Sequence, residues 1–106
     1  MKNLTRKEEM IILSILNLKE EAFLTAIRKH LSDVTNNNAS LTSVHIPLSR
    51  LEKGGLLLSS FGESTPERGG RRKKIYEVTK LGLAALSENK RISDLLWTNV
   101  LILKTS

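Results

Sequence analysis

Five cations and two glycines crowd one short stretch of the chain, residues 66–79, which reads PERGGRRKKIYEVT. The cations in it are Arg68, Arg71, Arg72, Lys73 and Lys74. Arginine and lysine are the side chains that neutralise phosphate, and glycine lets a backbone approach a polyanion closely. With Glu67 as the one anion, residues 67–74 carry a formal charge of +4. This basic segment is therefore a candidate site for a phosphate backbone.

The charge of the protein is concentrated in this basic segment. The 106-residue chain has a net charge of +6, so everything outside the segment supplies only +2. Such a local concentration favours a polyanion-binding element over a generally solubilising surface. The alternative is a run of solvated charges without a partner, which is common in proteins.

Composition excludes several other kinds of chemistry. The chain has no cysteine, so it has no disulfide or cysteine-ligated metal, and we expect a cytoplasmic protein. No stretch reaches the roughly 20 apolar residues of a membrane span. His30 and His45 lack partners at metal-ligand spacing, so we expect neither metal nor cofactor. No nucleophile with a neighbouring base and no nucleotide-binding loop stands out, which predicts that the protein is not an enzyme.

The first predicted element of the chain is a helix over residues 6–18. Thr5 and Glu8 have the spacing of a capping box at its start. The helix is apolar on more than one side, and in a chain of this size that favours burial against a second subunit. The residues predicted to make this contact are Ile11, Ile12 and Ile15.

Two further helices are predicted before the first strand. Apolar residues at helical spacing place one over residues 21–31. The next begins near Ser40, a suitable N-cap, and ends at Gly54. Pro47 lies inside that range, so the helix either kinks there or begins nearer Ser43. These two helices form a helix-turn-helix.

The basic segment belongs to a predicted hairpin, or wing. Its strands are residues 56–61 and 71–78, joined by a glycine-rich loop over residues 62–70. Alternation along a strand puts Tyr76 and Val78 on one face, packed on the core. The predicted fold is mainly α with a two-stranded β wing.

A last helix is predicted over residues 80–103, capped by Thr79 and long for the domain that carries it. Part of it follows a heptad-like seam typical of dimerisation. The residues of this seam are Ala85, Ile92, Leu96, Asn99 and Leu103. Trp97 has two interpretations, either a buried residue of a dimer interface or a wall of an aromatic effector pocket between subunits.

With these elements in place, the chain resembles the short subgroup of the PadR-type winged-helix transcriptional regulators. The stretches that carry the resemblance are LSRLEKGGLLLSS (residues 48–60), GESTPERGGRRKKIYEVTKLG (residues 62–82) and, more loosely, SLTSVHIPL (residues 40–48). His45 stands where the family usually has tyrosine. The resemblance implies a winged helix-turn-helix DNA-binding domain at residues 1–79 and a C-terminal dimerisation helix at residues 80–106.

The resemblance also implies a function and a set of site residues. It implies a bacterial homodimer that represses transcription by binding a palindromic operator in double-stranded DNA, with a small aromatic effector as a candidate ligand. The N-terminal half of the third helix would enter the major groove, and the wing would contact phosphates. The residues expected to bind DNA are Thr42, Ser43, His45, Ile46, Ser49, Arg50, Arg68, Arg71, Arg72, Lys73 and Lys74.

Several alternatives stay open at this point. Arg50 could contact phosphate or pair with a glutamate, the candidates being Glu8, Glu9 and Glu52. Ile46 could contact a thymine methyl group or belong to the core. The protein could activate rather than repress. It could also be a non-specific DNA- or RNA-binding winged helix, or a module whose basic loop docks an acidic protein.

Overall fold

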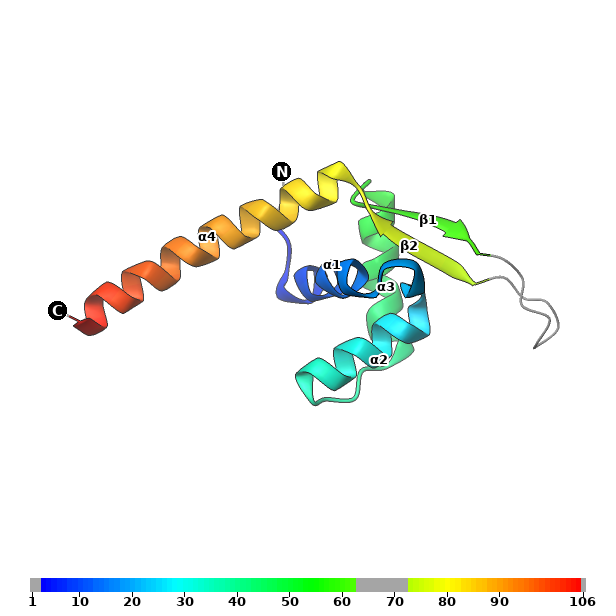
Figure 1. Ribbon diagram of the computed structural model, residues 1–106, viewed down its shortest axis with the longest axis horizontal. Helices are drawn as coiled ribbons and strands as arrows, with labels where there is room; N and C mark the ends of the chain where they lie inside the picture. The colour runs from blue at the N-terminus through cyan, green and yellow to red at the C-terminus, as the bar shows by residue number, and fades with distance from the viewer. Residues whose placement is uncertain (1–2, 63–72, 106) are drawn as a thin grey trace.

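In the residues that the structure describes, the protein consists of three helices, a two-stranded hairpin and a long final helix (Figure 1). The computed structural model describes residues 3–62 and 73–105. In Figure 1 the hairpin and α4 extend from the first three helices in opposite directions. In chain order the elements are α1 (Arg6–Leu18), a 3₁₀ turn η1 (Lys19–Glu21), α2 (Leu24–Thr35), α3 (Leu41–Lys53), β1 (Leu57–Phe61), β2 (Lys74–Val78) and α4 (Lys80–Thr105).

The start of α1 is the predicted capping box. The backbone N–H of Glu8 donates to the Thr5 hydroxyl at 3.1 Å, and the Thr5 N–H donates to the Glu8 carboxylate at 2.8 Å. These two bonds satisfy backbone donors that have no partner within the helix. At the other side of α1, the hydroxyl of Ser14 lies 2.9 Å from Nδ1 of His30 in α2.

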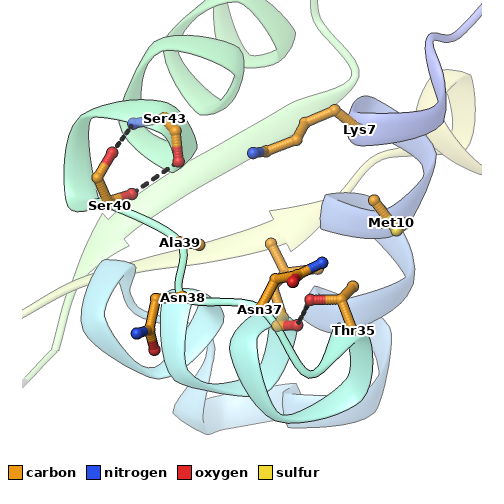
Figure 2. Close-up of a pocket in the computed structure, with 9 residues that line it drawn as sticks. Lys7, Met10, Thr35, Asn37, Asn38, Ala39, Ser40 and Ser43 are labelled. Carbon is orange, nitrogen blue, oxygen red and sulfur yellow. Dashed lines mark hydrogen bonds between the residues drawn. The ribbon is translucent and has the colours of Figure 1, made fainter.

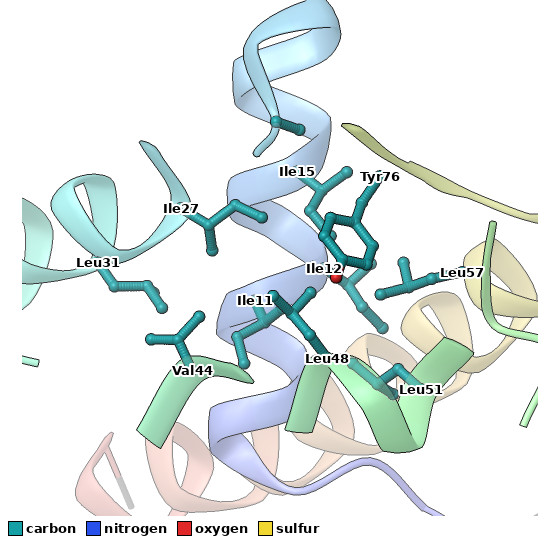
Figure 3. Close-up of a cluster of buried hydrophobic side chains, with 11 residues drawn as sticks. Ile11, Ile12, Ile15, Ile27, Leu31, Val44, Leu48, Leu51, Leu57 and Tyr76 are labelled. Atoms are coloured by element: carbon teal, nitrogen blue, oxygen red, sulfur yellow. The ribbon is translucent and has the colours of Figure 1, made fainter. Parts of the chain in front are cut away.

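The core is enclosed within one protomer, and α1 runs through its middle (Figure 3). This helix contacts α2, α3, β2 and α4, so its apolar residues are covered on more than one side without a partner. The relative exposures of Ile11, Ile12 and Ile15 are 0%, 0% and 2%. Their predicted contact with a second subunit is therefore corrected, because these side chains do not reach the surface. The exposed large apolar residues of α1 are instead Leu13 and Leu16.

The second helix begins later and ends later than predicted. Ala22 and Phe23 are not helical because they pair with the hairpin: Tyr76 N–H donates to the Ala22 carbonyl at 2.9 Å, and Phe23 forms a β-bridge with Ile75. Helix α2 then runs to Thr35. Asn36 ends it in the left-handed region at φ 57°, a conformation that asparagine tolerates.

Helix α3 begins at the predicted N-cap. The Ser40 hydroxyl accepts a hydrogen bond from the Ser43 N–H at 3.1 Å. The helix continues through Pro47, which is buried, so its start is not displaced to Ser43. It ends before Gly55, whose φ of 81° is a conformation that glycine adopts without strain.

The hairpin is antiparallel, and β2 as described runs from Lys74 to Val78. The predicted start of this strand at residue 71 lies outside the described part, as do all of residues 63–72. The register of the hairpin places Ser59 opposite Tyr76 and Phe61 opposite Lys74. Tyr76 is 4% exposed and belongs to the core, as the alternation of the strand predicts.

Helix α4 is attached to the domain only along its first part. Thr79 caps it, as predicted, by accepting from the Gly82 N–H at 3.1 Å, and its hydroxyl donates to the Gly55 carbonyl at 2.7 Å. Further along, the amide of Asn89 forms two hydrogen bonds with the backbone of Leu4, at 3.2 and 3.3 Å. From residue 93 to residue 100 the helix is exposed throughout.

Candidate nucleic-acid interface

One face of α3 is buried in the core and the opposite face is presented to solvent. The buried face consists of Val44, Pro47, Leu48 and Leu51. The helical period of 3.6 residues puts a different set at the centre of the opposite face. This set, which we call the outer face of α3, is Thr42, Ile46, Ser49 and Lys53. It mixes hydroxyl, apolar and cationic groups, which are the groups that contact base edges and phosphates.

Ile46 and Lys53 change the sequence interpretation of this helix. Ile46 is 51% exposed, so it is not a core residue. Lys53 was missing from the predicted site, yet it is exposed on the outer face. The spacing of four, three and four residues from Thr42 through Ile46 and Ser49 to Lys53 is the signal that would have identified it.

Two polar residues lie near the N-terminus of α3: Ser43 in its first turn and Lys7 of the neighbouring helix α1. The Ser43 hydroxyl donates to the Ser40 carbonyl at 2.9 Å, so it takes part in the helix cap (Figure 2). Beside the cap, a cavity of about 390 Å³ lies between α1, the turn before α3 and α3 itself. Lys7 extends from α1 toward this cap (Figure 2), a position that the sequence interpretation missed.

Arg50 lies on the edge of the outer face that is turned toward the N-terminus of α1. It is exposed and lines a cavity of about 590 Å³ together with Lys53, Thr5 and Glu8. Within the part of the chain that the structure describes, Arg50 makes no ion pair. The three glutamates considered as its partners have other contacts: Glu8 in the capping box, Glu9 with Arg6 at 3.7 Å, and Glu52 with Lys74 at 3.2 Å.

His45 lies on the other edge of the outer face, toward the wing. It lines a cavity of about 330 Å³ between the start of α2, α3 and β2. The sequence interpretation did not include two other residues of that cavity, Phe23 and Thr25. No local pattern could have identified them, because the pairing of Phe23 with β2 is a contact distant in sequence.

The basal cations of the wing, Lys73 and Lys74, both contact other parts of the protein. Lys74 Nζ lies 3.2 Å from the Glu52 carboxylate and 5.5 Å from the centre of the Tyr76 ring. Lys73 Nζ lies 4.1 Å above the ring of Phe23. The structure therefore gives each lysine an intramolecular partner that the sequence interpretation did not foresee. The predicted contacts of Arg68, Arg71 and Arg72 lie outside the described residues.

Hydrogen bonding keeps the pair of Glu52 and Lys74 ionised. The pKa of Glu52 is held below its ordinary value first by the hydrogen bond from the Ser59 hydroxyl and then by Lys74. The hydrogen bond to Glu52 raises the pKa of Lys74 above its ordinary value. Burial raises the pKa of Tyr76. Both groups of this ion pair are therefore charged around neutral pH.

The residues predicted for dimerisation fall into separate groups. Ala85 is 3% exposed and packs inside the protomer, so its predicted contact with a partner is corrected. Ile92 is half-buried, whereas Leu96 is 62% exposed and Asn99 is exposed. Leu103 lies in α4, but its side chain is outside the described part. Trp97 is 64% exposed on the part of α4 that extends from the domain.

Other kinds of site find no support in the described residues. None of the helices described there combines the length and the apolar composition needed to cross a membrane. Across residues 3–62 and 73–105, histidine, aspartate and glutamate side chains form no group that could hold a metal ion.

The fold and the outer face of α3 define a winged helix-turn-helix protein of the DNA-binding class. The model of the PadR-like family of transcriptional regulators matches residues 12–88. The chain therefore belongs to this family. It is a DNA-binding regulator of transcription and not an enzyme, as the sequence predicted.

Solved structures of similar proteins agree with this assignment. A PadR-like transcription factor from Bacteroides fragilis is 25% identical, with a TM-score of 0.71 and 92% of both chains covered. A PadR family regulator from Eggerthella lenta is 28% identical, with a TM-score of 0.69 and coverage of 92% of this chain and 83% of that one. No curated protein matches the sequence.

Proposed function

We propose that the protein is a homodimeric repressor that reads a palindromic operator in double-stranded DNA through α3 and the wing. The observation that carries this proposal is the outer face of α3, where Thr42, Ile46 and Lys53 are exposed and Ser49 is half-buried. A helix fits the major groove of B-DNA, where hydroxyl groups can bond base edges and an isoleucine can pack on a thymine methyl group. Residues 1–79 form the DNA-binding unit and residues 80–106 the dimerisation helix. The regulator acts in the cytoplasm.

The dimer is built from the far part of α4. This helix has 26 residues, and beyond its attachment to the domain it exposes Leu95 at 54%, Leu96 at 62% and Trp97 at 64%. Large apolar side chains gathered on one exposed helix mark an association surface. On α1, Leu13 and Leu16 are 43% and 40% exposed and extend the apolar surface available to a partner.

The interface prediction is tested by Leu96→Glu, which places a charge on that surface. We expect sedimentation to show a monomer for this variant and a dimer for the wild type. The residue is exposed in the protomer, so the circular dichroism spectrum should stay the same. Leu58→Glu is the matched control, because Leu58 is equally exposed, at 62%, but lies in the hairpin. A dimer that survives Leu96→Glu would place the interface elsewhere.

Sequence recognition is tested by selection from a pool of random duplexes at about 150 mM salt, near physiological ionic strength. A symmetric dimer should enrich an inverted repeat whose half-sites lie about 34 Å, one helical turn, apart or a modest variation on that. No enrichment, with binding that disappears as salt rises, would leave a non-specific charge-driven binder. Stronger retention of structured RNA than of duplex would favour the RNA-binding alternative.

The outer face of α3 is tested by Lys53→Gln. If Lys53 neutralises a phosphate, the slope of log affinity against log salt should become shallower by about 0.9 per protomer. Lys90→Gln is the matched control, because Lys90 pairs with Asp94 at 2.6 Å on α4, far from α3. Equal slopes for the two variants would remove Lys53 from the interface.

Repression and effector binding follow from the same proposal. A reporter gene behind the selected operator should be repressed by the protein, and increased expression would indicate an activator instead. A small aromatic effector would meet Trp97 between the subunits, where it should quench the tryptophan fluorescence and weaken operator binding together. Quenching without any change in operator affinity would argue against a regulatory ligand at this position.

A further inference from the structure

The carboxylate of Glu52 links α3 to both strands of the hairpin. Glu52 lies in the last turn of α3, on the edge that is turned toward the wing. It accepts a hydrogen bond from the Ser59 hydroxyl of β1 and pairs with Lys74 Nζ of β2 at 3.2 Å. One side chain of the recognition helix is thus bonded to both strands of the wing.

Neighbouring residues of the hairpin partly shield the contact between Glu52 and Lys74 from water. Ser59 lies opposite Tyr76 in the hairpin, and the buried Tyr76 ring lies beneath Lys74. The side chains of Lys74 and Glu52 are 43% and 31% exposed, so the pair is partly shielded from water. Hydrogen bonds that involve an ionised group are shorter and stronger than neutral ones.

A second contact holds β2 on its other side. Lys73, which precedes β2, covers the Phe23 ring at 4.1 Å, and the Tyr76 N–H donates to the Ala22 carbonyl. The base of the wing is therefore fixed both to α3 and to the start of α2. Lys74 in particular already has a carboxylate partner for its ammonium group on α3.

We infer that Glu52 is a positioning residue for DNA recognition: it fixes the wing relative to α3 and withholds Lys74 from the phosphate backbone. The inference rests on the proposed function, in which α3 and the wing bind the same duplex. A lysine at the wing base that was free to bind phosphate would add affinity for every sequence alike, because phosphate contacts carry no sequence information. By holding Lys74, Glu52 favours discrimination between operator and random DNA over total affinity.

The experiment measures binding to the selected operator and to a random duplex over a series of salt concentrations. Glu52→Gln keeps the shape of the side chain but removes the charge that holds Lys74. We expect the salt slope to become steeper by about 0.9 per protomer, because one more phosphate is neutralised. Random-duplex affinity should rise more than operator affinity, so the ratio between them falls. Lys74→Gln alone should leave the wild-type slope unchanged.

Two controls separate this effect from a general gain in positive charge or a loss of structure. Glu77→Gln removes an equal charge from the same strand, but Glu77 is exposed on the opposite face and releases no lysine. Its salt slope should match the wild type. The double variant Glu52→Gln with Lys74→Gln should return to the wild-type slope. A purely structural role for Glu52 would weaken binding without steepening the slope.

The outcomes that overturn the inference are distinct from those that overturn the function. If Lys74→Gln makes the wild-type slope shallower, Lys74 already contacts phosphate. If Glu52→Gln and Glu77→Gln share one slope, or if the steeper slope persists in the double variant, Glu52 does not withhold Lys74. If the wild-type protein shows no salt-dependent binding to duplex DNA, the proposed function fails as well.

Discussion

Gly82 packs the first turn of α4 against the segment before β1, and a methyl group there tests how close this packing is. Gly82 lies in the first turn of α4 and is buried. A Cβ at this position would overlap the carbonyl oxygen of Leu56 and come within 2.8 Å of Val78 Cγ1. Backbone of the segment before β1 cannot move aside as a flexible side chain can, so α4 would have to shift.

The sign of the effect separates packing from helix propensity. Alanine is favoured over glycine inside a helix by about 1 kcal/mol, which alone would stabilise Gly82→Ala. Overpacking a close contact typically costs about 1–3 kcal/mol, and an overlap with backbone belongs at the upper end. The net loss should be about 2 kcal/mol, or a fall in Tm of roughly 10 °C for a chain of this size.

Thermal unfolding followed by circular dichroism measures this loss, with all proteins at the same protomer concentration because a dimer's Tm depends on it. Gly54→Ala is the matched control: its φ is −79°, and its Cβ would meet Arg50 and Leu56 at ordinary contact distances of 3.4 Å. Its Tm should stay the same or rise slightly. A Gly82→Ala protein as stable as the wild type would refute the close packing of α4 against the segment before β1.

Three further predictions concern stability. Ser40→Ala removes the cap of α3 and should cost about 1 kcal/mol in urea unfolding, whereas Thr42→Ala on the exposed face should cost much less. Leu48→Ala leaves a cavity in the core, where Leu48 is 0% exposed, and should lower the free energy of unfolding by about 2–5 kcal/mol in the same assay. The Ser59 hydrogen bond lowers the pKa of Glu52, so the stability it provides is present above the unfolded-state pKa and lost as pH falls through the folded-state pKa. Glu52→Gln should therefore flatten the acid side of a plot of Tm against pH, and an unchanged plot would contradict the bond.

The element boundaries that could be predicted from the sequence are those set by local chemistry. Thr5, Ser40 and Thr79 each cap a helix where the sequence placed the cap. The start of α2 could not be predicted in this way, because Ala22 and Phe23 are extended only through their pairing with β2. A cap depends on a few neighbouring residues, whereas this pairing depends on a strand more than fifty residues away.

The residues predicted for the dimer interface show the same difference between what a local pattern can and cannot predict. Periodicity identifies Ile11 and Ile12 as buried, but it cannot tell whether a core or a second subunit buries them. The structure assigns them to the core because α1 contacts several elements of its own protomer. The partner of Lys74 was equally inaccessible to a local pattern, since Glu52 lies in another element and is brought near only by the fold.

We expect the wing to neutralise fewer phosphates than the charge of the basic segment suggests. If the three wing arginines together with Arg50 and Lys53 bind phosphate in each protomer, a dimer makes ten such contacts and its salt slope should be about −9. If Lys73 and Lys74 also bound phosphate, there would be fourteen contacts and a slope of about −13. Because both lysines have partners within the protein, we expect the shallower value. A wild-type slope near the steeper value would mean that DNA displaces these partners and that the contacts at the wing base do not persist in the complex.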